Sequence, residues 1–208
     1  MTLEVLLQYL DEPCFNQLRT IEQLGYVVFS MGANYRDVMG ARFLVQSSQY
    51  SCDYIVNSLH NFIQDYWGKV QQLTEEEFKV QVQAVVTRVS EKDYNLNGEA
   101  DRLFAEITTH KYIFNRKEKQ VEILQTLTKQ DIVDMYQKLL ISSESKRIDV
   151  MLNSQTHTEM QAEWKAKNNE ALYKEKPRTY VEETPAQFKL KMELYPDVFK
   201  ANYANAKM

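Results

Sequence analysis

An arginine and a tyrosine seven positions apart are the side chains of this sequence best suited to act on another molecule. They open and close the run Arg19-Thr20-Ile21-Glu22-Gln23-Leu24-Gly25-Tyr26. Phe15 precedes Arg19 by four residues, so the two share one face of a helix. Gly25 can take the left-handed conformation that stops a helix, and Tyr26 then begins a β-branched, aromatic run typical of a strand. We therefore expect a helix end to bring a cation, a phenol and an aromatic ring to one site.

These side chains offer two kinds of interaction. A guanidinium makes several directed contacts to backbone carbonyls or to a carboxylate. A phenol is neutral at pH 7 and donates one directed hydrogen bond, which can meet negative charge developing on an oxygen atom. A plainer interpretation is also open: Arg19 could pair with Glu22 one turn on, and Tyr26 could be an ordinary strand aromatic. Phe15 could equally be a core residue, and spacing alone favours the plainer interpretation.

The segment continues Val27-Val28-Phe29-Ser30 and resembles a segment of the insulinase family, the pitrilysin-type inverzincin metallopeptidases. In that family the segment reads Arg-Thr-x-Glu-Gln-Leu-Gly-Tyr-x-Val-Phe-Ser. The likeness extends through residues 42–47, the helix start at 127–132 and the Ala-Asn-Ala-Lys-Met ending, and it weakens between about 153 and 180. In the family, this arginine and tyrosine reach across a chamber to grip the substrate.

By this resemblance Arg19 and Tyr26 are catalytic and substrate-binding residues, and Phe15 is a substrate-binding residue of a side pocket. The match over eight consecutive residues, with its flanks, favours this role over the plainer interpretation. The implied partners are peptide substrates and a separate N-terminal half of the enzyme, which holds zinc through H-x-x-E-H. The implied function is cleavage of peptides in an enclosed chamber.

A zinc peptidase needs two histidines and a carboxylate at ligand spacing, together with a glutamate as general base. The histidines of this chain are His60, His110 and His157, which are far apart, and none stands in H-x-x-E-H or its inverse. We assign no metal ligand here and expect zinc in an N-terminal domain absent from this chain. The chain is then a C-terminal fragment, inactive alone, and Met1 would be an internal methionine of a longer gene. A non-catalytic pitrilysin-like binding or assembly module is the alternative.

The predicted fold class is α+β, with an antiparallel sheet packed against several helices in a partial insulinase-type domain. Strands are predicted over 26–31 and 38–48, joined by a loop over 32–37 that contains Gly and Asn. Alternation of apolar and polar residues over 147–152 predicts another strand in the same sheet. Strands upstream of the first helix are missing from the chain, so we expect an uncovered sheet edge and self-association into a homo-oligomer.

Helices are predicted from apolar residues at three and four spacing and from capping signals. The first is a kinked pair ending at Leu24, with Asp11 capping its second part and Pro13 early in that part. Others begin near Tyr50, after the capping box Thr74–Glu77 and at Thr128–Asp131. Between the last two, Leu103, Phe104 and Ile107 indicate a helix running to about Tyr112, and a shorter helix is predicted around Val121 to Leu124.

The 208 residues are predicted to form one insulinase-type C-terminal domain. Residues 153–180 are a polar variable segment that could be a solvated helix or a loose connection. Residues 181–208 are a docking tail, because a free end would not carry so many aromatic residues. The aromatic and other large apolar residues of the tail are Phe188, Leu190, Leu194, Tyr195, Phe199 and Tyr203, and Tyr180 lies just before it.

Composition narrows the class of protein. A net charge of −4 and a pI near 5.5 argue against a nucleic-acid surface. No apolar run approaches the roughly 18 residues of a membrane span, and no signal peptide is visible. Cys14 and Cys52 are too few for a disulfide framework and indicate reduced thiols in the cytoplasm. The ending Ala206-Lys207-Met208 is a distant variant of the Ser-Lys-Leu signal, which leaves peroxisomal import as a weaker possibility.

Overall fold

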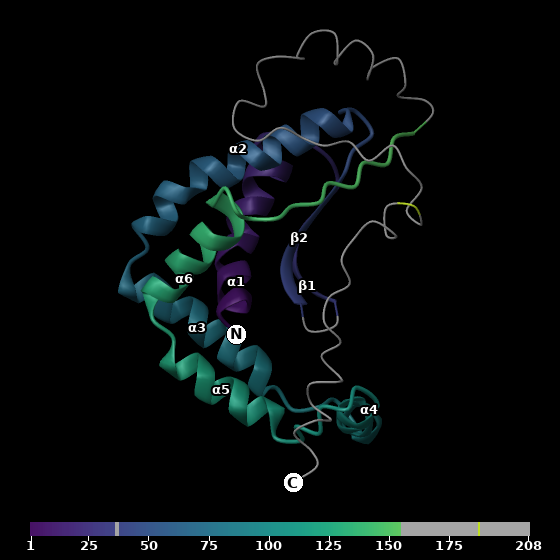
Figure 1. The fold of residues 1–208 in the computed structure, drawn as a ribbon, viewed down its shortest axis with the longest axis vertical. Helices are drawn as coiled ribbons and strands as arrows, with labels where there is room; N and C mark the ends of the chain where they lie inside the picture. The colour runs from purple at the N-terminus through teal and green to yellow at the C-terminus, as the bar shows by residue number, and fades with distance from the viewer. Residues whose placement is uncertain (36–37, 155–186, 188–208) are drawn as a thin grey trace.

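The computed structural model describes residues 1–35, 38–154 and 187 (Figure 1). It confirms an α+β architecture in which helices pack against an antiparallel hairpin. The elements in chain order are helix α1 (Thr2–Phe15), π-helix η1 (Asn16–Ile21), strands β1 (Val27–Tyr35) and β2 (Val38–Gln46), helices α2 (Cys52–Gln71), α3 (Glu75–Ser90), α4 (Leu96–Thr108), α5 (Arg116–Thr126) and α6 (Lys129–Tyr136), and π-helix η2 (Gln137–Ile141).

Several sequence predictions fall on residues that the structure does not describe. The polar segment 153–180 lies, after Ser154, outside the described residues, as do His157 and the tail 181–208 apart from Gln187. Within the ranges that are described, no helix is both long and apolar enough to cross a membrane.

The hairpin is longer than the sequence predicted. Its register runs from Val27 opposite Gln46 to Tyr35 opposite Val38. The predicted loop over 32–37 is wrong, because Gly32 continues the ladder and pairs with Ala41. Gly32 faces α1, where a Cβ would lie 3.6 Å from the Leu7 side chain. This glycine therefore sits under a helix and does not make a turn.

The strand predicted over 147–152 does not form among the described residues, whose one sheet has two strands. Its alternating apolar side chains Ile148, Val150 and Leu152 are 78–86% exposed. The segment instead runs beside α2, where Cys52 Sγ donates to the Leu152 carbonyl at 3.5 Å and a nitrogen of Arg147 lies 3.1 Å from His60 Nδ1. Alternation makes a strand only when another strand offers its backbone groups, and none is adjacent among the residues that the structure describes.

Helix α1 runs unbroken through Asp11 and Pro13 and continues directly into η1 as far as Ile21, so the predicted second start at Asp11 and the predicted end at Leu24 are wrong. Pro13 lies inside α1. Asp11, which was predicted to cap a second helix, instead accepts a hydrogen bond from the Ser30 hydroxyl at 3.0 Å. An apolar stripe continues on both sides of the proline, and its burial outweighs the missing backbone donor. The most buried members of the stripe are Val5, Leu6, Leu10, Cys14 and Leu18.

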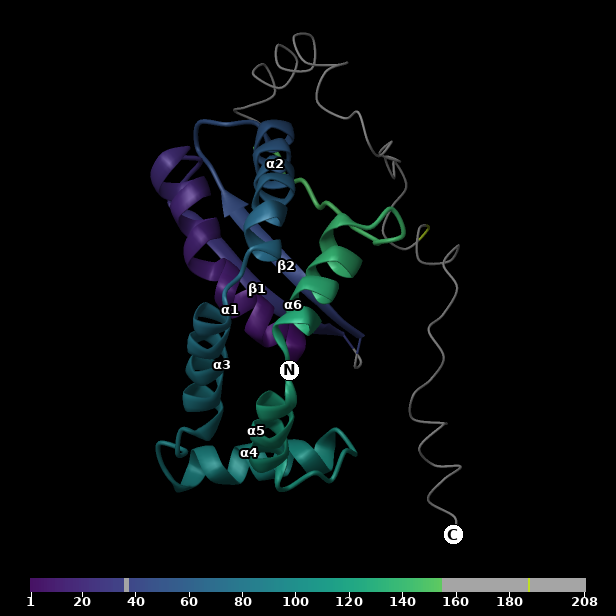
Figure 2. The same ribbon diagram turned by 90° about the vertical axis from the view of Figure 1, so that its left-hand side faces the viewer.

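The core lies where α1 meets the hairpin on one side and α3 and α6 on the other (Figures 1 and 2). Tyr136 at the end of α6 is fully buried, stacks on Trp67 with ring centroids 5.6 Å apart, and donates from its hydroxyl to the Ile63 carbonyl at 2.7 Å. Burial raises the pKa of the Tyr136 phenol and raises that of the Cys14 thiol to about 12. Both groups therefore act as packed core side chains.

Local capping signals were read correctly in two places. Thr74 and Glu77 exchange hydrogen bonds of 3.2 and 2.9 Å at the start of α3, and Thr128 and Asp131 do the same for α6. The helix indicated by Leu103, Phe104 and Ile107 forms as α4. It begins where Asn95 caps it by accepting from the Gly98 N–H at 2.8 Å, and it ends at Thr108, so the predicted run to about Tyr112 is wrong.

Candidate functional site

The end of the first helix is a π-helical turn. The Glu22 N–H donates to the Gln17 carbonyl at 2.9 Å, five residues back, and the Gln17 amide donates to the Glu22 carboxylate at 2.9 Å. Residues five apart are about 140° apart around an α-helix and meet only when the turn is widened. The Gln17–Glu22 side-chain contact therefore fits, and stabilises, the π form of this turn.

The helix stops at Gln23, and the prediction that Gly25 takes the left-handed conformation is wrong. Gln23 has φ 53°, no described glycine has positive φ, and the Leu24 N–H closes the helix by donating to the Leu18 carbonyl at 2.9 Å. Gly25 serves another purpose, since a Cβ there would lie 1.9 Å from the Gln46 carbonyl oxygen. Only glycine allows the chain to pass so close to the end of β2.

The three predicted site residues come together at this helix end. The Cζ atom of Arg19 lies 4.7 Å from the ring centroid of Phe15 and 4.7 Å from that of Tyr26. Both distances are within cation–π range. Phe15 is 39% exposed and Tyr26 is 83% exposed, so the rings are open to solvent. The arrangement is a half-buried cation held between two accessible aromatic rings.

The ion pair of the plainer interpretation is not formed. Glu22 is engaged by Gln17, and within the described part of the chain no ion pair or side-chain hydrogen bond involves Arg19. A cation–π contact uses no N–H donor, so the guanidinium can still donate to carbonyls or a carboxylate brought against it.

No zinc site is formed by the described residues, in which no three His, Cys, Asp or Glu side chains converge as metal ligands. His60 contacts Arg147, and His110 Nδ1 lies 3.3 Å from the Tyr112 hydroxyl. These side chains do not fit the ligand set of a catalytic zinc ion.

Sequence reasoning missed the residues that shape this site. Gln17 and Glu22 are five apart, and residues at this spacing do not face each other on an α-helix. Helix periodicity therefore could not predict their contact. Gln23 is likewise an unexpected residue for a left-handed conformation, which Gly and Asn usually occupy at helix ends.

Comparison with known proteins places the chain in a family. Residues 5–104 match a family model described as PQQ synthase PqqF-like, C-terminal lobe domain 4. Human insulin-degrading enzyme is 35% identical over 153 residues, covering 74% of this chain and 15% of that protein. The A-factor-processing enzyme of Saccharomyces cerevisiae is 32% identical over 148 residues, covering 71% of this chain and 14% of its own length. Human nardilysin is 32% identical over 136 residues, covering 64% of this chain and 12% of that protein.

The fold points the same way. The crystal structure of pitrilysin is similar with a TM-score of 0.60 and 28% sequence identity, over 65% of this chain and 14% of that chain. The chain thus spans about one seventh of the length of these relatives. It belongs to the insulinase, or pitrilysin, family and corresponds to part of the C-terminal lobe of its members.

Proposed function

We propose that the chain is the substrate-binding and transition-state-assisting C-terminal domain of a zinc metalloendopeptidase similar to insulin-degrading enzyme, which cleaves peptides in an enclosed chamber. The observation that supports this most strongly is the Arg19 guanidinium, 4.7 Å from the rings of both Phe15 and Tyr26 at a solvent-open helix end. Family membership supports the peptidase class.

Arg19 positions the substrate. Its guanidinium donates to backbone carbonyls of an extended peptide or to a carboxylate, which fixes the register of the peptide in the site. The two rings restrain the long side chain before the peptide arrives, so less conformational entropy is lost on binding. Phe15 adds an apolar wall beside the bound peptide.

Tyr26 assists the chemical step. Its hydroxyl donates to the substrate oxygen on which negative charge grows during attack on the peptide carbonyl. The contact with Arg19 and the close passage of Gly25 past Gln46 hold the phenol in place before the reaction. A pre-organised donor of this kind contributes roughly 10²–10³ in rate.

Zinc supplies the activated water of such an enzyme, and the N-terminal half provides its ligands, whether on the same polypeptide or on a separate chain. The described residues form no ligand set of their own, so we expect no metal-dependent turnover from this chain alone. The cytoplasm is the compartment proposed for the assembled enzyme, because Cys14 and Cys52 are both free thiols.

The test is to combine the chain with a zinc-bearing N-terminal half of a related enzyme and to measure kcat/KM for peptide cleavage. Tyr26→Phe removes one hydroxyl and is expected to lower kcat/KM by about 10²–10³. Tyr35→Phe is the matched control, because Tyr35 is also exposed, at 67%, but lies at the far end of the same hairpin.

Undiminished cleavage by the Tyr26→Phe variant would contradict the proposed role of the phenol. A complex that assembles and binds peptide without cleaving it would support the alternative, a non-catalytic binding or assembly module. Turnover by the chain alone with added zinc would contradict the assignment of zinc to another half.

A further inference from the structure

Helix α4 presents its apolar side to solvent. The one residue of α4 that is buried is a glutamate, Glu106. Leu96, Phe104 and Ile107 are 79%, 62% and 43% exposed, and they lie on one side of the helix. A surface helix normally turns such a side toward the core. Among the described residues, nothing covers it.

Ion pairs on another side of α4 fix this orientation. Glu106 pairs with Arg116 at the start of α5 and also accepts from the Ile113 N–H at 3.2 Å. One turn earlier, Arg102 pairs with Asp93 at 3.0 Å. Two anchors on one side of the helix prevent it from rolling its apolar side inward.

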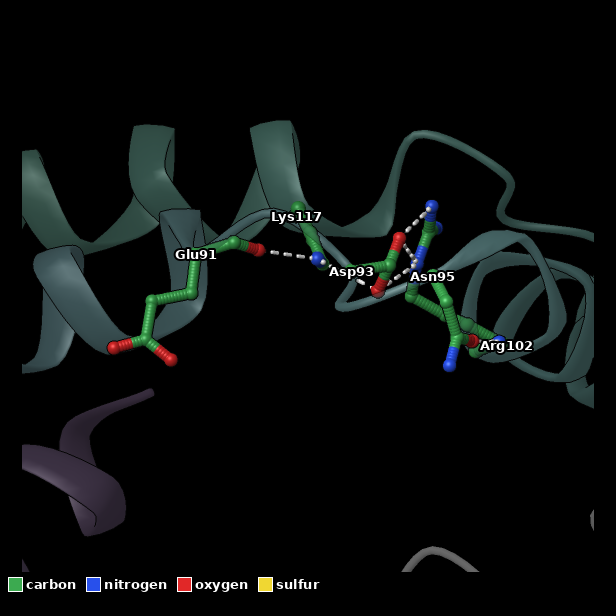
Figure 3. A network of polar contacts seen from close by, with 6 residues as sticks. Glu91, Asp93, Asn95, Arg102 and Lys117 are labelled. Carbon is green, nitrogen blue, oxygen red and sulfur yellow. Dashed lines mark hydrogen bonds and ion pairs between the residues drawn. The ribbon is translucent and has the colours of Figure 1, made fainter.

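The second anchor belongs to a wider network (Figure 3). Asp93 also accepts from Lys117 at 3.1 Å, and the same ammonium donates to the Glu91 carbonyl at 2.6 Å. The network joins the segment before α4 to α5, at the end of the molecule away from α2 (Figures 1 and 2). The ion pairs around α4 therefore hold its apolar side toward solvent, where it is suited to contact another segment.

We propose that residues 188–203 of this chain dock on the outward side of α4 formed by Leu96, Phe104 and Ile107. Burial of the large apolar side chains of this segment would stabilise the contact. They are Phe188, Leu190, Leu194, Tyr195, Phe199 and Tyr203. No other stretch after Ser154 combines so many.

The charges at the start of this segment are opposite to those beside the apolar side of α4. Phe188 and Leu190 alternate with Lys189 and Lys191, so an extended segment would present an apolar side and a basic side. The exposed acids Glu99 and Asp101 of α4 flank its apolar side. Basic residues beside the docked apolar side chains would meet these carboxylates.

Length also permits the contact. Thirty-three residues lie between Ser154 and Phe188. At up to about 3.3 Å for each residue, such a segment reaches much farther than the roughly 15 Å radius of gyration of a domain of this size. The reach of the chain therefore does not restrict where the tail binds.

The test uses the full chain and hydrogen–deuterium exchange read by mass spectrometry. Amides of 188–203 are expected to be protected, and the double substitution Leu96→Lys/Phe104→Lys should speed their exchange by about tenfold or more. Val80→Lys/Ile123→Lys is the matched control, since these residues on α3 and α5 are also exposed, at 63% and 49%. Unchanged exchange of α1 amides shows that each variant is folded.

A second measurement locates the contact without an apolar substitution. A zero-length carbodiimide crosslinker should join the amine of Lys189 or Lys191 to the carboxylate of Glu99 or Asp101 within one chain, and Glu99→Gln/Asp101→Asn should abolish the crosslink. Exchange of 188–203 at the rate of an unfolded peptide, or protection that persists in the Leu96→Lys/Phe104→Lys variant, would overturn the proposal. Protection that is lost on dilution would assign the surface to a second copy and overturn it as well.

Discussion

At the scale of single residues, the group around Arg19 was the most predictable feature. The spacing of Phe15 and Arg19 places them on one helix face, and a strand beginning near Tyr26 starts beside the helix end. The resemblance of the whole segment, and not spacing alone, favoured their meeting over a pair of Arg19 with Glu22. The partner of Glu22 was not predictable, because Gln17 reaches it only across a widened turn. Contacts that depend on ordinary helix periodicity can be read from a sequence, and contacts that depend on a departure from it cannot.

Glu106 is the residue for which pH dependence can be predicted. Its hydrogen bonds from Arg116 hold the pKa of the carboxyl below its ordinary value. Since the folded pKa is the lower one, this stabilisation is present above the unfolded value of about 4.3 and is lost as pH falls through the folded pKa. Glu106→Gln should therefore lower Tm at pH 7, by about 2–4 °C for each kcal/mol lost, and the loss should be smaller at pH 3.

Thermal unfolding followed by circular dichroism at both pH values measures this difference. Glu122→Gln is the control, because Glu122 is an exposed glutamate of the neighbouring helix α5. A loss of Tm in the Glu106→Gln variant that is equal at pH 7 and pH 3 would show that the carboxylate charge is not what stabilises α4.

At the scale of elements, what could be predicted depended on how local the cause is. The capping boxes at Thr74 and Thr128 are formed within four residues and were read correctly. The predicted strand over 147–152 failed because a strand needs a partner that the sequence of the segment cannot reveal. The helix through Pro13 was missed because the burial of its apolar stripe outweighs a local penalty.

Gly25 joins the helix end to β2, and its replacement is predicted to be costly. Gly25→Ala places a Cβ 1.9 Å from the Gln46 carbonyl oxygen, so the backbone must shift. We expect a loss of about 1–3 kcal/mol or more in the free energy of unfolding, measured in urea. Gly68→Ala in α2 is the control, since its Cβ meets no atom within 4 Å and alanine should stabilise the helix by about 0.5–1 kcal/mol. A Gly25→Ala variant as stable as the parent would disprove the close passage.

At the scale of the whole molecule, the hairpin is the surface from which self-association is expected. Val28 is buried and Ser30 bonds to Asp11 of α1, so Phe29 between them points away from that helix, as does its cross-strand partner Leu44. These two side chains are 52% and 43% exposed. Neither edge of the hairpin has a further strand among the described residues. Open edges and an apolar face favour pairing with another chain.

Light scattering over a range of concentrations tests this. The mean mass should rise with concentration, and Phe29→Lys should suppress the rise, whereas Val80→Lys on the exposed side of α3 should leave it unchanged. A constant monomer mass up to high concentration would contradict the expectation. The assay is independent of the contact proposed for α4, which lies with α5 at the lower end of the molecule, below the hairpin (Figure 2).

The widened turn at residues 16–21 also bears on how this segment can change in evolution. A π turn holds one residue more than an α turn, so deleting one residue there would convert it to ordinary α-helix, and the elements on either side would keep their relative orientation. Gln17 and Glu22 would then be four apart, the spacing of an ordinary α-helical pair. An alignment gap of a single position in this interval would therefore mark a homologue in which the helix ends without the widened turn.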